Sequence, residues 1–385
     1  MQTDLSAADC SPETVPPTIT WPARTTPSSA TLADLTTLHV GGAPRRYVET
    51  ATEAELIDAV RAADTDGEPL LVLGGGSNLL VADAGFDGVV VRDVRNGIEV
   101  PDASACAGAT LTVPAGTPWD DVVRYAVEQE LTGIETLSGI PGSTGATPVQ
   151  NVGAYGQEVA QSIATVRVWD RGRGKVRTLP LVTLAFGYRT SLLKRSMREV
   201  DSADPRAPWA PTPRYVVLDV TFQLRPGNLS RPIAYAELAR TLGVELGQRA
   251  PLADVRDTVL ALRARKGMVL DPTDHDTWSA GSFFTNPILS AEQAAALPEA
   301  APRFPTEDGR VKTSAAWLIE RSGFSRGFGA PGPATLSTKH TLALTNRGGA
   351  KAEDLLALAR QVRDGVRSTF GLELEPEPVL VGVSL

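Results

Sequence analysis

The residues best suited to chemistry lie in a glycine-rich stretch from Ser138 to Gly156, which reads SGIPGSTGATPVQNVGAYG. Glycine lets another molecule approach the main chain without a Cβ in the way, and successive backbone N–H groups in such a loop can converge on an anion. A second loop, from Leu73 to Leu80, reads LGGGSNLL and follows an apolar run. Either loop alone could be an ordinary tight turn, but two in one chain predict a large phosphorylated cofactor bound by backbone.

Neither loop matches the common nucleotide-binding fingerprints. A Rossmann start places its glycines between a strand and a helix, whereas residues 79–81 after the triple glycine look extended. The sequence G-x-x-x-x-G-K-[ST] does not occur, which argues against P-loop chemistry. The three histidines, His39, His275 and His340, have no metal-ligand spacing, so no metal site is predicted.

The composition is that of an ordinary globular protein. A chain of 385 residues exceeds what one core usually organises, so two or three domains are expected. The formal net charge of −8 argues against nonspecific nucleic-acid binding. The two cysteines, Cys10 and Cys106, form no readable disulfide framework or zinc site. Since no secretory signal or membrane-spanning run is seen either, we expect a cytoplasmic protein that engages no membrane.

The apolar pattern predicts alternating strands and helices after an N-terminal tail. Residues 1–30 are rich in Pro, Ser, Thr and Ala and are expected to be disordered, and residues 198–213 read as a surface insertion. Strands are expected at 46–48, 70–73, 88–91, 111–113, 166–169, 215–224, 282–284 and 342–345. Helices are expected at 53–63, 119–129, 235–242, 251–264, 313–320 and 352–370.

Five stretches together carry a specific resemblance. They are IPGSTGATPVQNVGAYG, LGGGSNLL, FGYRTS at 186–191, AGSFFTNP at 280–287 and LEPEP at 374–378. They occur in the order seen in the UDP-N-acetylenolpyruvoylglucosamine reductase (MurB) family, and the similarity runs from about residue 35 to residue 382. Such a series is far more specific than any single motif.

The resemblance implies an α+β protein: a two-subdomain FAD-binding fold of the vanillyl-alcohol-oxidase type plus a C-terminal α+β substrate-binding domain. The expected segments are a disordered tail at 1–30, FAD-binding subdomain 1 at 31–95, FAD-binding subdomain 2 with a substrate-capping segment at 96–266, the substrate-binding domain at 267–371, and a C-terminal segment at 372–385 that returns to the active site. Tyr235, in IAYAEL, resembles the substrate-capping tyrosine of the longer family type.

The implied cofactors are non-covalently bound FAD and NADPH as the reductant. On this interpretation the two loops bind the FAD pyrophosphate and flank the isoalloxazine ring. The residues expected to contact FAD are Gly74, Gly75, Gly76, Ser77, Asn78, Leu79, Ile140, Pro141, Gly142, Ser143, Gly145, Ala146, Gln150, Asn151, Gly153, Ala154 and Tyr155. The expected partners are a UDP-sugar enolpyruvate and NADPH, without nucleic acid, and we expect a monomer.

The implied reaction reduces UDP-N-acetylglucosamine enolpyruvate to UDP-N-acetylmuramate in peptidoglycan precursor synthesis. A hydride from FAD N5 reaches the β-carbon, negative charge accumulates on the α-carbon and its carboxylate, and a proton must then reach the α-carbon. Arg189 matches the residue expected to hold the carboxylate, Glu377 would lie beside the enolate, and Ser282 resembles the proton donor. Taken alone, Arg189 and Glu377 also fit ordinary surface charges, and Ser282 fits a hydroxyl bonded within a turn.

The nucleotide half of the substrate has its own candidate residues. Tyr235, Lys266 and Asn286 match family positions for the diphosphate and neighbouring groups, and Arg263 could share the anion with Lys266, although Lys266 also fits simple complementation of a helix C-terminus. Val379 stands where some relatives carry an arginine, so one carboxylate contact is either missing or supplied from elsewhere. Two alternatives stay open: a flavin oxidase of the same fold, and a non-catalytic nucleotide-sugar binding protein. Neither loop holds a histidine for the covalent flavin attachment common in such oxidases.

Overall fold

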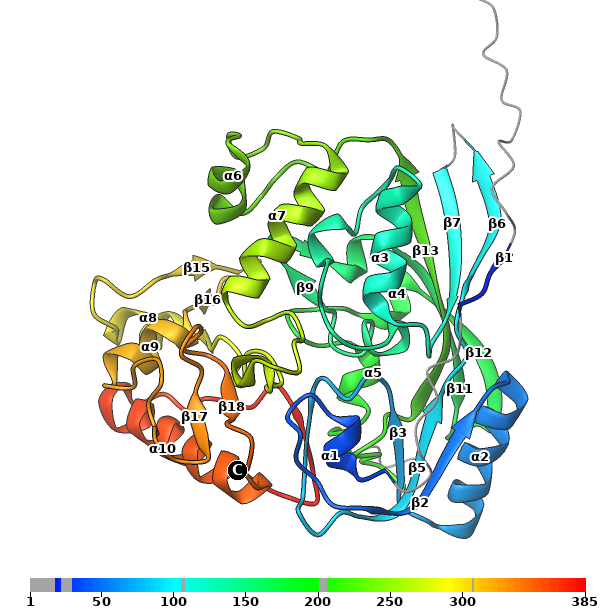
Figure 1. Ribbon diagram of the computed structural model, residues 1–385, viewed down its shortest axis with the longest axis horizontal. Coiled ribbons are helices and arrows are strands. Elements are labelled where there is room, and N and C mark those ends of the chain that lie inside the picture. The colour runs from blue at the N-terminus through cyan, green and yellow to red at the C-terminus, as the bar shows by residue number, and fades with distance from the viewer. Residues whose placement is uncertain (1–17, 22–29, 105–107, 201–205, 307) are drawn as a thin grey trace, which may run out of the picture.

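The computed structural model describes residues 18–21, 30–104, 108–200, 206–306 and 308–385, and everything below concerns these residues. Cys10 and Cys106 lie outside them. The N-terminal two thirds of the chain form two sheets with their helices, and the C-terminal elements gather on one side of the molecule (Figure 1).

A small parallel sheet forms the first of these units. Its order is β2-β5-β3, with β2 at Pro44–Thr50, β5 at Phe86–Asp93 and β3 at Leu70–Leu73. Helix α2 (Glu53–Asp66) packs its apolar face against this sheet. The helix begins at a capping box of Thr52 and Glu55 and ends at Gly67, whose φ of 66° is left-handed. The strands predicted at 46–48, 70–73 and 88–91 and the helix predicted at 53–63 are confirmed.

A larger, mainly antiparallel sheet follows. In the described part of the chain it has seven strands: β1 (Thr18–Ile19), β6 (Ile98–Ser104), β7 (Gly108–Pro114), β13 (Tyr215–Pro226), β11 (Ile163–Asp170) and β12 (Lys175–Pro180) in that order, with β8 (Leu131–Thr132) paired to β13. The same part of the chain also contains α3 (Trp119–Glu128), the separate hairpin β9–β10 (Gly153–Ala154, Gln157–Glu158), α4 (Leu181–Leu184), α5 (Leu192–Arg195), α6 (Ala236–Leu242) and α7 (Leu252–Arg265). Trp119 of α3 packs on Phe222 of β13, with ring centroids 5.6 Å apart, and joins the helix to the sheet.

The C-terminal elements build a separate apolar core. They are β14 (Ile288–Leu289), α8 (Ala291–Ala296), β15 (Phe304–Pro305), β16 (Val311–Lys312), α9 (Ala315–Arg321), β17 (Ala334–Leu336), β18 (Leu344–Asn346) and α10 (Ala352–Phe370). Helix α10 places seven buried residues along one face and ends at Gly371, with φ of 68°. The short helix α1 (Leu32–Leu35) lies near the parallel sheet (Figure 1).

The end of the chain returns to the N-terminal half. Strand β19 (Val379–Val381) pairs in parallel with β4 (Leu79–Val81), and Val379 stands opposite Leu79. The residues just before β19 therefore lie beside the residues just before β4. The backbone N–H of Val379 donates to the carbonyl of Asn78 at 2.9 Å, which fixes this register.

Three predictions made from the sequence differ from the structure. The disordered tail at 1–30 is interrupted by β1, which pairs with β6, while residues 1–17 and 22–29 lie outside the described residues. No strand forms at 282–284, because the only ladder contact of this run within the described residues is an isolated bridge between Phe284 and Pro376. Residues 198–213 are not wholly a surface insertion, because Trp209 and Thr212 are buried.

Within the described residues, no helix is both long and apolar enough to cross a membrane. No group of three or more His, Cys, Asp or Glu side chains there is arranged to hold a metal ion.

Candidate active site

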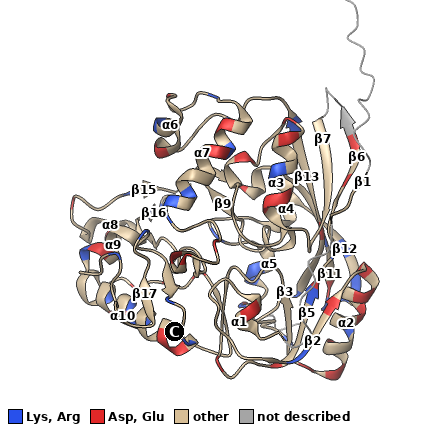
Figure 2. Ribbon diagram, in the orientation of Figure 1, with Lys and Arg blue, Asp and Glu red and all other residues tan. Residues whose placement is uncertain are grey.

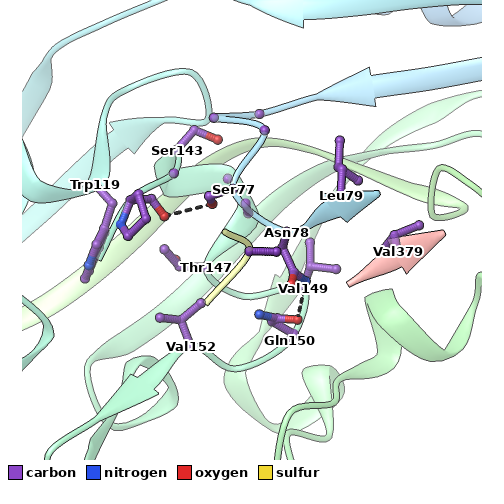
Figure 3. A pocket seen from close by; sticks show the side chains of 18 of the residues that line it. Ser77, Asn78, Leu79, Trp119, Ser143, Thr147, Val149, Gln150, Val152 and Val379 are labelled. Atoms are coloured by element: carbon purple, nitrogen blue, oxygen red, sulfur yellow. Dashed lines mark hydrogen bonds between the residues drawn. The ribbon is translucent and has the colours of Figure 1, made fainter. Parts of the chain in front are cut away.

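The two glycine-rich loops lie side by side and line one cavity of about 320 Å³ (Figure 3). A Cβ built on Gly75 would lie 2.5 Å from the Cα of Gly142, so the loops touch backbone to backbone. Ser77 Oγ donates to the carbonyl of Pro141 at 2.9 Å and ties one loop to the other. Residues with larger side chains could not stand here, because the contact leaves no room for them.

The same loops present bare backbone donors to the cavity. Within the described residues, the N–H groups of Gly75, Gly76 and Ser77 have no hydrogen-bond partner, although all three residues line the cavity. Buried or half-buried N–H groups are normally paired, so a row of free ones at a cavity wall indicates a ligand with acceptor oxygens. Consecutive N–H groups in a loop suit a phosphate group.

Most residues predicted to bind the cofactor line this cavity. They are Gly74, Gly75, Gly76, Ser77, Asn78, Leu79, Ile140, Pro141, Gly142, Ser143, Gly145, Ala146, Gln150 and Gly153. The predicted residues Asn151, Ala154 and Tyr155 are not among those that line it. Asn151 instead supports the site from behind: its side chain donates to Glu158 at 2.7 Å, and its carbonyl accepts from Arg189 at 3.4 Å.

A charged cluster occupies one end of the cavity. Nε of Arg189 lies 3.2 Å from Oε1 of Glu377, and the guanidinium also donates through Nη2 to the carbonyl of Gly153 at 2.9 Å. Arg189 has φ of 52°, a left-handed conformation that side-chain-bearing residues rarely adopt, and such strain is concentrated at functional sites. Its buried Nε lies at ion-pair distance from Glu377, although it is not in hydrogen-bonding geometry to any described residue.

Lys194, which the sequence analysis missed, completes this cluster. It is buried and lines the cavity, and its Nζ lies 3.4 Å from Oε1 of Gln150 and 3.5 Å from the carbonyl of Glu377. The basic residues of α5 stand near the centre of the molecule (Figure 2). Gln150 Oε1 also accepts from Asn78 at 2.8 Å, so its Nε2 faces the Glu377 carboxylate at 3.3 Å (Figure 3). In the side-chain amide of Gln150, Oε1 therefore accepts hydrogen bonds and Nε2 donates one.

Burial and the nearby charges of opposite sign have opposing effects on the pKa values of Glu377 and Lys194. Burial raises the pKa of Glu377, and the positive charges of Arg189 and Lys194 oppose that shift. Burial also lowers the pKa of Lys194 to about 8, with Glu377 opposing. With Glu377 ionised and both bases protonated, the cluster has a net charge of +1, which suits one incoming carboxylate.

Backbone pairing brings Ser282 to the same wall. The N–H of Glu377 donates to the carbonyl of Phe283 at 2.8 Å, and the N–H of Thr285 donates to the carbonyl of Glu375 at 3.0 Å. Ser282 precedes this pairing and lines the cavity, and its hydroxyl has no hydrogen-bond partner in the described part of the chain. Arg189, Ser282 and Glu377, far apart in the sequence, thus line one cavity.

The residues predicted for the nucleotide half of the substrate are divided between two places. The Tyr155 and Tyr235 rings meet edge to face at 5.3 Å, and Nζ of Lys266 lies 5.7 Å from the Tyr155 ring centroid and 2.5 Å from Oε2 of Glu237. Arg263 lines the main cavity with a buried, unpaired Nε, and burial lowers its pKa to about 10.

Asn286 lies in a neighbouring cavity of about 660 Å³, which shares Arg189 and Lys194 with the first. Its Oδ1 accepts from the N–H of Ala315, at the start of α9, at 2.9 Å. Val379 lines the main cavity as an aliphatic side chain, so it supplies no contact to a carboxylate there.

Comparison with known proteins decides the family. The model of an FAD binding domain matches residues 44–180, and the model of the UDP-N-acetylenolpyruvoylglucosamine reductase C-terminal domain matches residues 271–381. A UDP-N-acetylenolpyruvoylglucosamine reductase from Cutibacterium acnes is 56% identical over 92% of this chain and 90% of its own length. One from Streptomyces avermitilis is 51% identical over 94% of this chain and 100% of its own length.

The chain belongs to the UDP-N-acetylenolpyruvoylglucosamine reductase family. The crystal structure of the MurB protein from Thermus caldophilus has the same fold, with a TM-score of 0.57 and 26% identity over 91% of this chain and 97% of that one. The predicted family, the α+β fold class with its FAD-binding fold, the enzyme class of oxidoreductase and the FAD cofactor are thereby confirmed. The roles of single residues and the segment boundaries stay predictions.

The cavity fits the FAD of this family in two respects. The unpaired N–H groups of Gly75, Gly76 and Ser77 offer donors suited to a pyrophosphate, and the glycine contacts leave backbone where a Cβ would fill the cradle. The guanidinium of Arg189 lines the same cavity, where an anionic substrate group would meet it. When bound, FAD would supply hydride chemistry that no side chain of the chain can provide.

Replacing Gly75 with alanine is expected to weaken FAD binding. The added Cβ would lie 2.5 Å from the Cα of Gly142, so the loops must separate, and a strain of this kind corresponds to roughly a 10- to 100-fold increase in Kd. Flavin absorbance per protein after purification and titration of the apoprotein with FAD measure the change. Gly349→Ala is the control, because nothing lies within 4 Å of its added Cβ. Equal flavin content in both variants would show that the loop contact does not hold FAD.

The charge of Lys194 is expected to make flavin reoxidation depend on pH. Its pKa of about 8 means that the ammonium loses its proton as the pH rises through 8, so the attraction for an anionic substrate declines on the alkaline side. The second-order rate constant of reoxidation at low substrate concentration, which reports groups of the free enzyme, should fall above about pH 8. Lys194→Arg should remove this fall, whereas Lys312→Met, outside both cavities, should keep it. An unchanged alkaline limb in Lys194→Arg would contradict the assignment.

Proposed function

We propose that this chain reduces the enolpyruvyl ether of UDP-N-acetylglucosamine to UDP-N-acetylmuramate, with NADPH as the source of electrons and FAD as the carrier. The observation that carries the proposal is that Arg189, Ser282 and Glu377 line the same cavity as the two glycine loops. The reaction needs a fixed cation for a carboxylate, a proton donor for a carbon atom and a cradle for FAD. One cavity offers all three.

Arg189 and Lys194 prepare the electrostatic part of the reaction. Both are charged side chains held by backbone and amide groups, so they need little rearrangement when an anionic substrate arrives. As the β-carbon accepts hydride, negative charge builds on the α-carbon and the carboxylate. Arg189 binds the carboxylate through its guanidinium, and its preorganised charge stabilises the enolate more than the ground state.

Glu377 holds Arg189 in place and limits its mobility. The carboxylate lies 3.2 Å from Nε and accepts from Gln150 at 3.3 Å, and only 12% of its side chain is exposed. Since burial raises its pKa, Glu377 is poised to take up a proton when the substrate carboxylate enters, which would relieve repulsion between the two anions. A protonated Glu377 would donate a hydrogen bond to the developing enolate.

Ser282 gives the α-carbon its proton. Its hydroxyl has no partner among the described residues, and Ser282 lines the same cavity as Arg189 and Glu377, so the hydroxyl is free to donate. A serine hydroxyl is a weak acid, but a carbanion stabilised only as an aci-carboxylate is basic enough to take this proton. The hydroxyl then regains a proton from solvent. Since the segment 281–285 is tied to 375–377, this donor is fixed relative to Arg189 and Glu377.

The nucleotide half would lie along Tyr235, Arg263 and Lys266. Arg263 is buried with an unpaired Nε at the cavity, which suits a phosphate oxygen, and Lys266 must leave Glu237 to reach the same anion. Tyr235 is 42% exposed and stands against Tyr155, a position from which it can cover a ligand. Asn286 would contact the substrate only from the neighbouring cavity, so it is the weakest member of this set.

The finer expectations belong to the same proposal. The segments 31–95 and 96–266 would serve as the two FAD-binding subdomains, 267–371 as the substrate-binding domain and 372–385 as the returning segment. The pairing of β19 with β4 supports the last of these. We further propose that the chain acts as a monomer in the cytoplasm, in cell-wall precursor synthesis. A net charge of −8 supports the absence of nucleic acid among its partners.

The steady-state test is consumption of NADPH on addition of the enolpyruvyl sugar nucleotide. The proposal predicts a product heavier than the substrate by two hydrogens, formed in the amount of NADPH consumed. Formation of hydrogen peroxide with an alcohol or sugar substrate, and no reduction of the enolpyruvyl ether, would identify a flavin oxidase instead. Tight binding of the sugar nucleotide without NADPH consumption would identify a binding protein.

A further inference from the structure

The segment 206–213 forms a wall of the main cavity that neither the glycine loops nor the reactive residues explain. Pro211, Thr212 and Pro213 line the cavity, and Thr212 is only 1% exposed. This segment lies between α5 and β13, in the stretch that the sequence suggested was a surface insertion. Its buried residues indicate a specific role at the cavity.

Thr212 attaches this segment to the edge of the parallel sheet. Strand β3 is an edge strand, and the Thr212 hydroxyl donates to the carbonyl of Leu70 at 2.9 Å and accepts from the N–H of Val72 at 2.8 Å. One side chain therefore satisfies two backbone groups that a neighbouring strand would otherwise pair. These two hydrogen bonds hold residues 211–213 beside β3.

A cluster around Arg171 holds the rest of the segment. The Arg171 guanidinium donates to the carbonyl of Thr212 at 3.1 Å, pairs with Asp64 at 2.6 Å and stands 4.5 Å from the Trp209 ring centroid. Arg206 stands 4.4 Å from the same ring. Trp209 is 6% exposed, so its buried ring, in contact with both guanidinium groups, anchors the segment.

The order of contacts along residues 70–78 places this wall relative to the reactive residues. Thr212 bonds the main chain at Leu70 and Val72, the three glycines follow, and Asn78 at the far end bonds Gln150 and lies 3.4 Å from the carbonyl of Glu377. The glycine loop therefore lies between Thr212 at one end and Glu377 at the other. Both ends belong to one cavity.

FAD has its pyrophosphate in the middle of the molecule, between the isoalloxazine and the adenosine. With the pyrophosphate at the glycine loop and the reactive ring toward Glu377, the adenosine must extend toward Thr212. The cavity there is lined by apolar side chains, Leu71, Val216 and Val217, together with the two prolines, as suits a flat aromatic base. We propose that residues 211–213, held by Thr212, form the adenosine-binding wall and make this chain select FAD over FMN. This inference rests on the FAD cofactor and not on the sugar-nucleotide substrate.

The test compares FAD with FMN, which lacks the adenosine half. In Thr212→Val the hydroxyl is lost at nearly constant volume, two backbone groups lose their partner, and the Kd for FAD should rise by about tenfold. The Kd for FMN should stay the same, and Thr212→Ser should restore the affinity for FAD. An equal loss of affinity for both flavins would show that Thr212 only supports the fold, and no loss for either would show that the wall does not contact the cofactor. Both results overturn the inference.

A measurement on the unaltered chain covers the case in which Thr212→Val does not fold. Hydrogen exchange of the backbone amides in 206–214 should be slower in the FAD-loaded protein than in the FMN-loaded protein, because only FAD reaches this wall. The amides of Gly75 to Asn78 provide the control, since both flavins carry a phosphate that the loop can bind. Equal exchange of 206–214 in the two loaded forms would contradict the inference, whatever the reductase activity proves to be.

Discussion

Ser282→Ala is expected to leave reduction of FAD by NADPH nearly unchanged and to slow reoxidation by the enolpyruvyl sugar nucleotide by a factor of about 10² to 10⁴. The reason is that hydride delivery to FAD requires no proton from this hydroxyl, whereas the α-carbon needs one. Ser282 lines the cavity beside the Glu377 segment and has no other partner among the described residues that its loss would disturb. Rapid mixing under anaerobic conditions measures the two half-reactions separately.

Two further variants make the Ser282 experiment specific. Ser282→Cys keeps an acidic hydrogen at the same place and should recover part of the reoxidation rate. Thr285→Val lies three residues further along, where the hydroxyl is directed to the carbonyl of Glu375 at 3.4 Å, and it should change neither half-reaction. A Ser282→Ala variant that loses both half-reactions equally would remove Ser282 from the role of proton donor.

Arg189→Met is expected to have the second largest effect, a loss of about 10² to 10³ in the rate of reoxidation. The substitution removes the cation that stabilises the enolate and leaves the buried carboxylate of Glu377 with Lys194 as its remaining nearby cation. The backbone conformation at φ of 52° is equally unfavourable for methionine and arginine, so the comparison isolates the side chain. The substrate Kd and the limiting rate of reoxidation, measured separately, locate the loss.

Two further variants serve as controls: one places lysine at position 189, and the other replaces a nearby arginine. Arg189→Lys retains the charge but not the planar pair of donors, so it should recover only part of the rate. Arg195→Met alters an arginine of the same short helix as Lys194, whose guanidinium donates to the carbonyl of Ala185 at 3.1 Å, and it should have little effect. If Arg195→Met proved as damaging as Arg189→Met, the effect would come from the general positive field and not from a carboxylate contact.

Local sequence patterns predicted what local physics determines. The spacing of apolar residues predicted helices at 53–63 and 352–370, and the structure has them at 53–66 and 352–370. Capping residues, such as Thr52 at a start and Gly371 at an end, set such boundaries locally. The glycine loops were predictable for the same reason. Three consecutive glycines, Gly74 to Gly76, indicate without any tertiary information that another group can approach the main chain closely.

Lys194 shows what the sequence could not supply. Nothing distinguishes it locally from a solvated lysine on a short helix, because its importance comes from Gln150, 44 residues before it, and Glu377, 183 residues after it. The only signal was its place in the same segment as Arg189, five residues later. Pairing of β19 with β4 brings these residues together, and that pairing depends on the whole fold.

The strand predicted at 282–284 failed for a related reason. The two aromatic residues of the run Ser282-Phe283-Phe284 favour a strand, but among the described residues the run forms only one bridge, between Phe284 and Pro376, and proline has no N–H to extend a ladder. The segment is instead held by separate hydrogen bonds to Leu342 and Glu377. This irregular backbone leaves the Ser282 hydroxyl unpaired at the cavity. Strand β1 was missed because two residues carry no periodic signal, and its pairing with β6 is a tertiary contact.

The central claim is that one cavity accepts electrons from NADPH through FAD and passes them to an enolpyruvyl ether held by Arg189. The most direct test is an anaerobic titration of the purified, FAD-loaded protein. The account predicts that equimolar NADPH bleaches the visible flavin band and that an equimolar amount of the enolpyruvyl sugar nucleotide restores it, with UDP-N-acetylmuramate formed in the same amount. A bleached flavin that the sugar nucleotide cannot reoxidise would contradict the account, as would a protein that takes up no FAD.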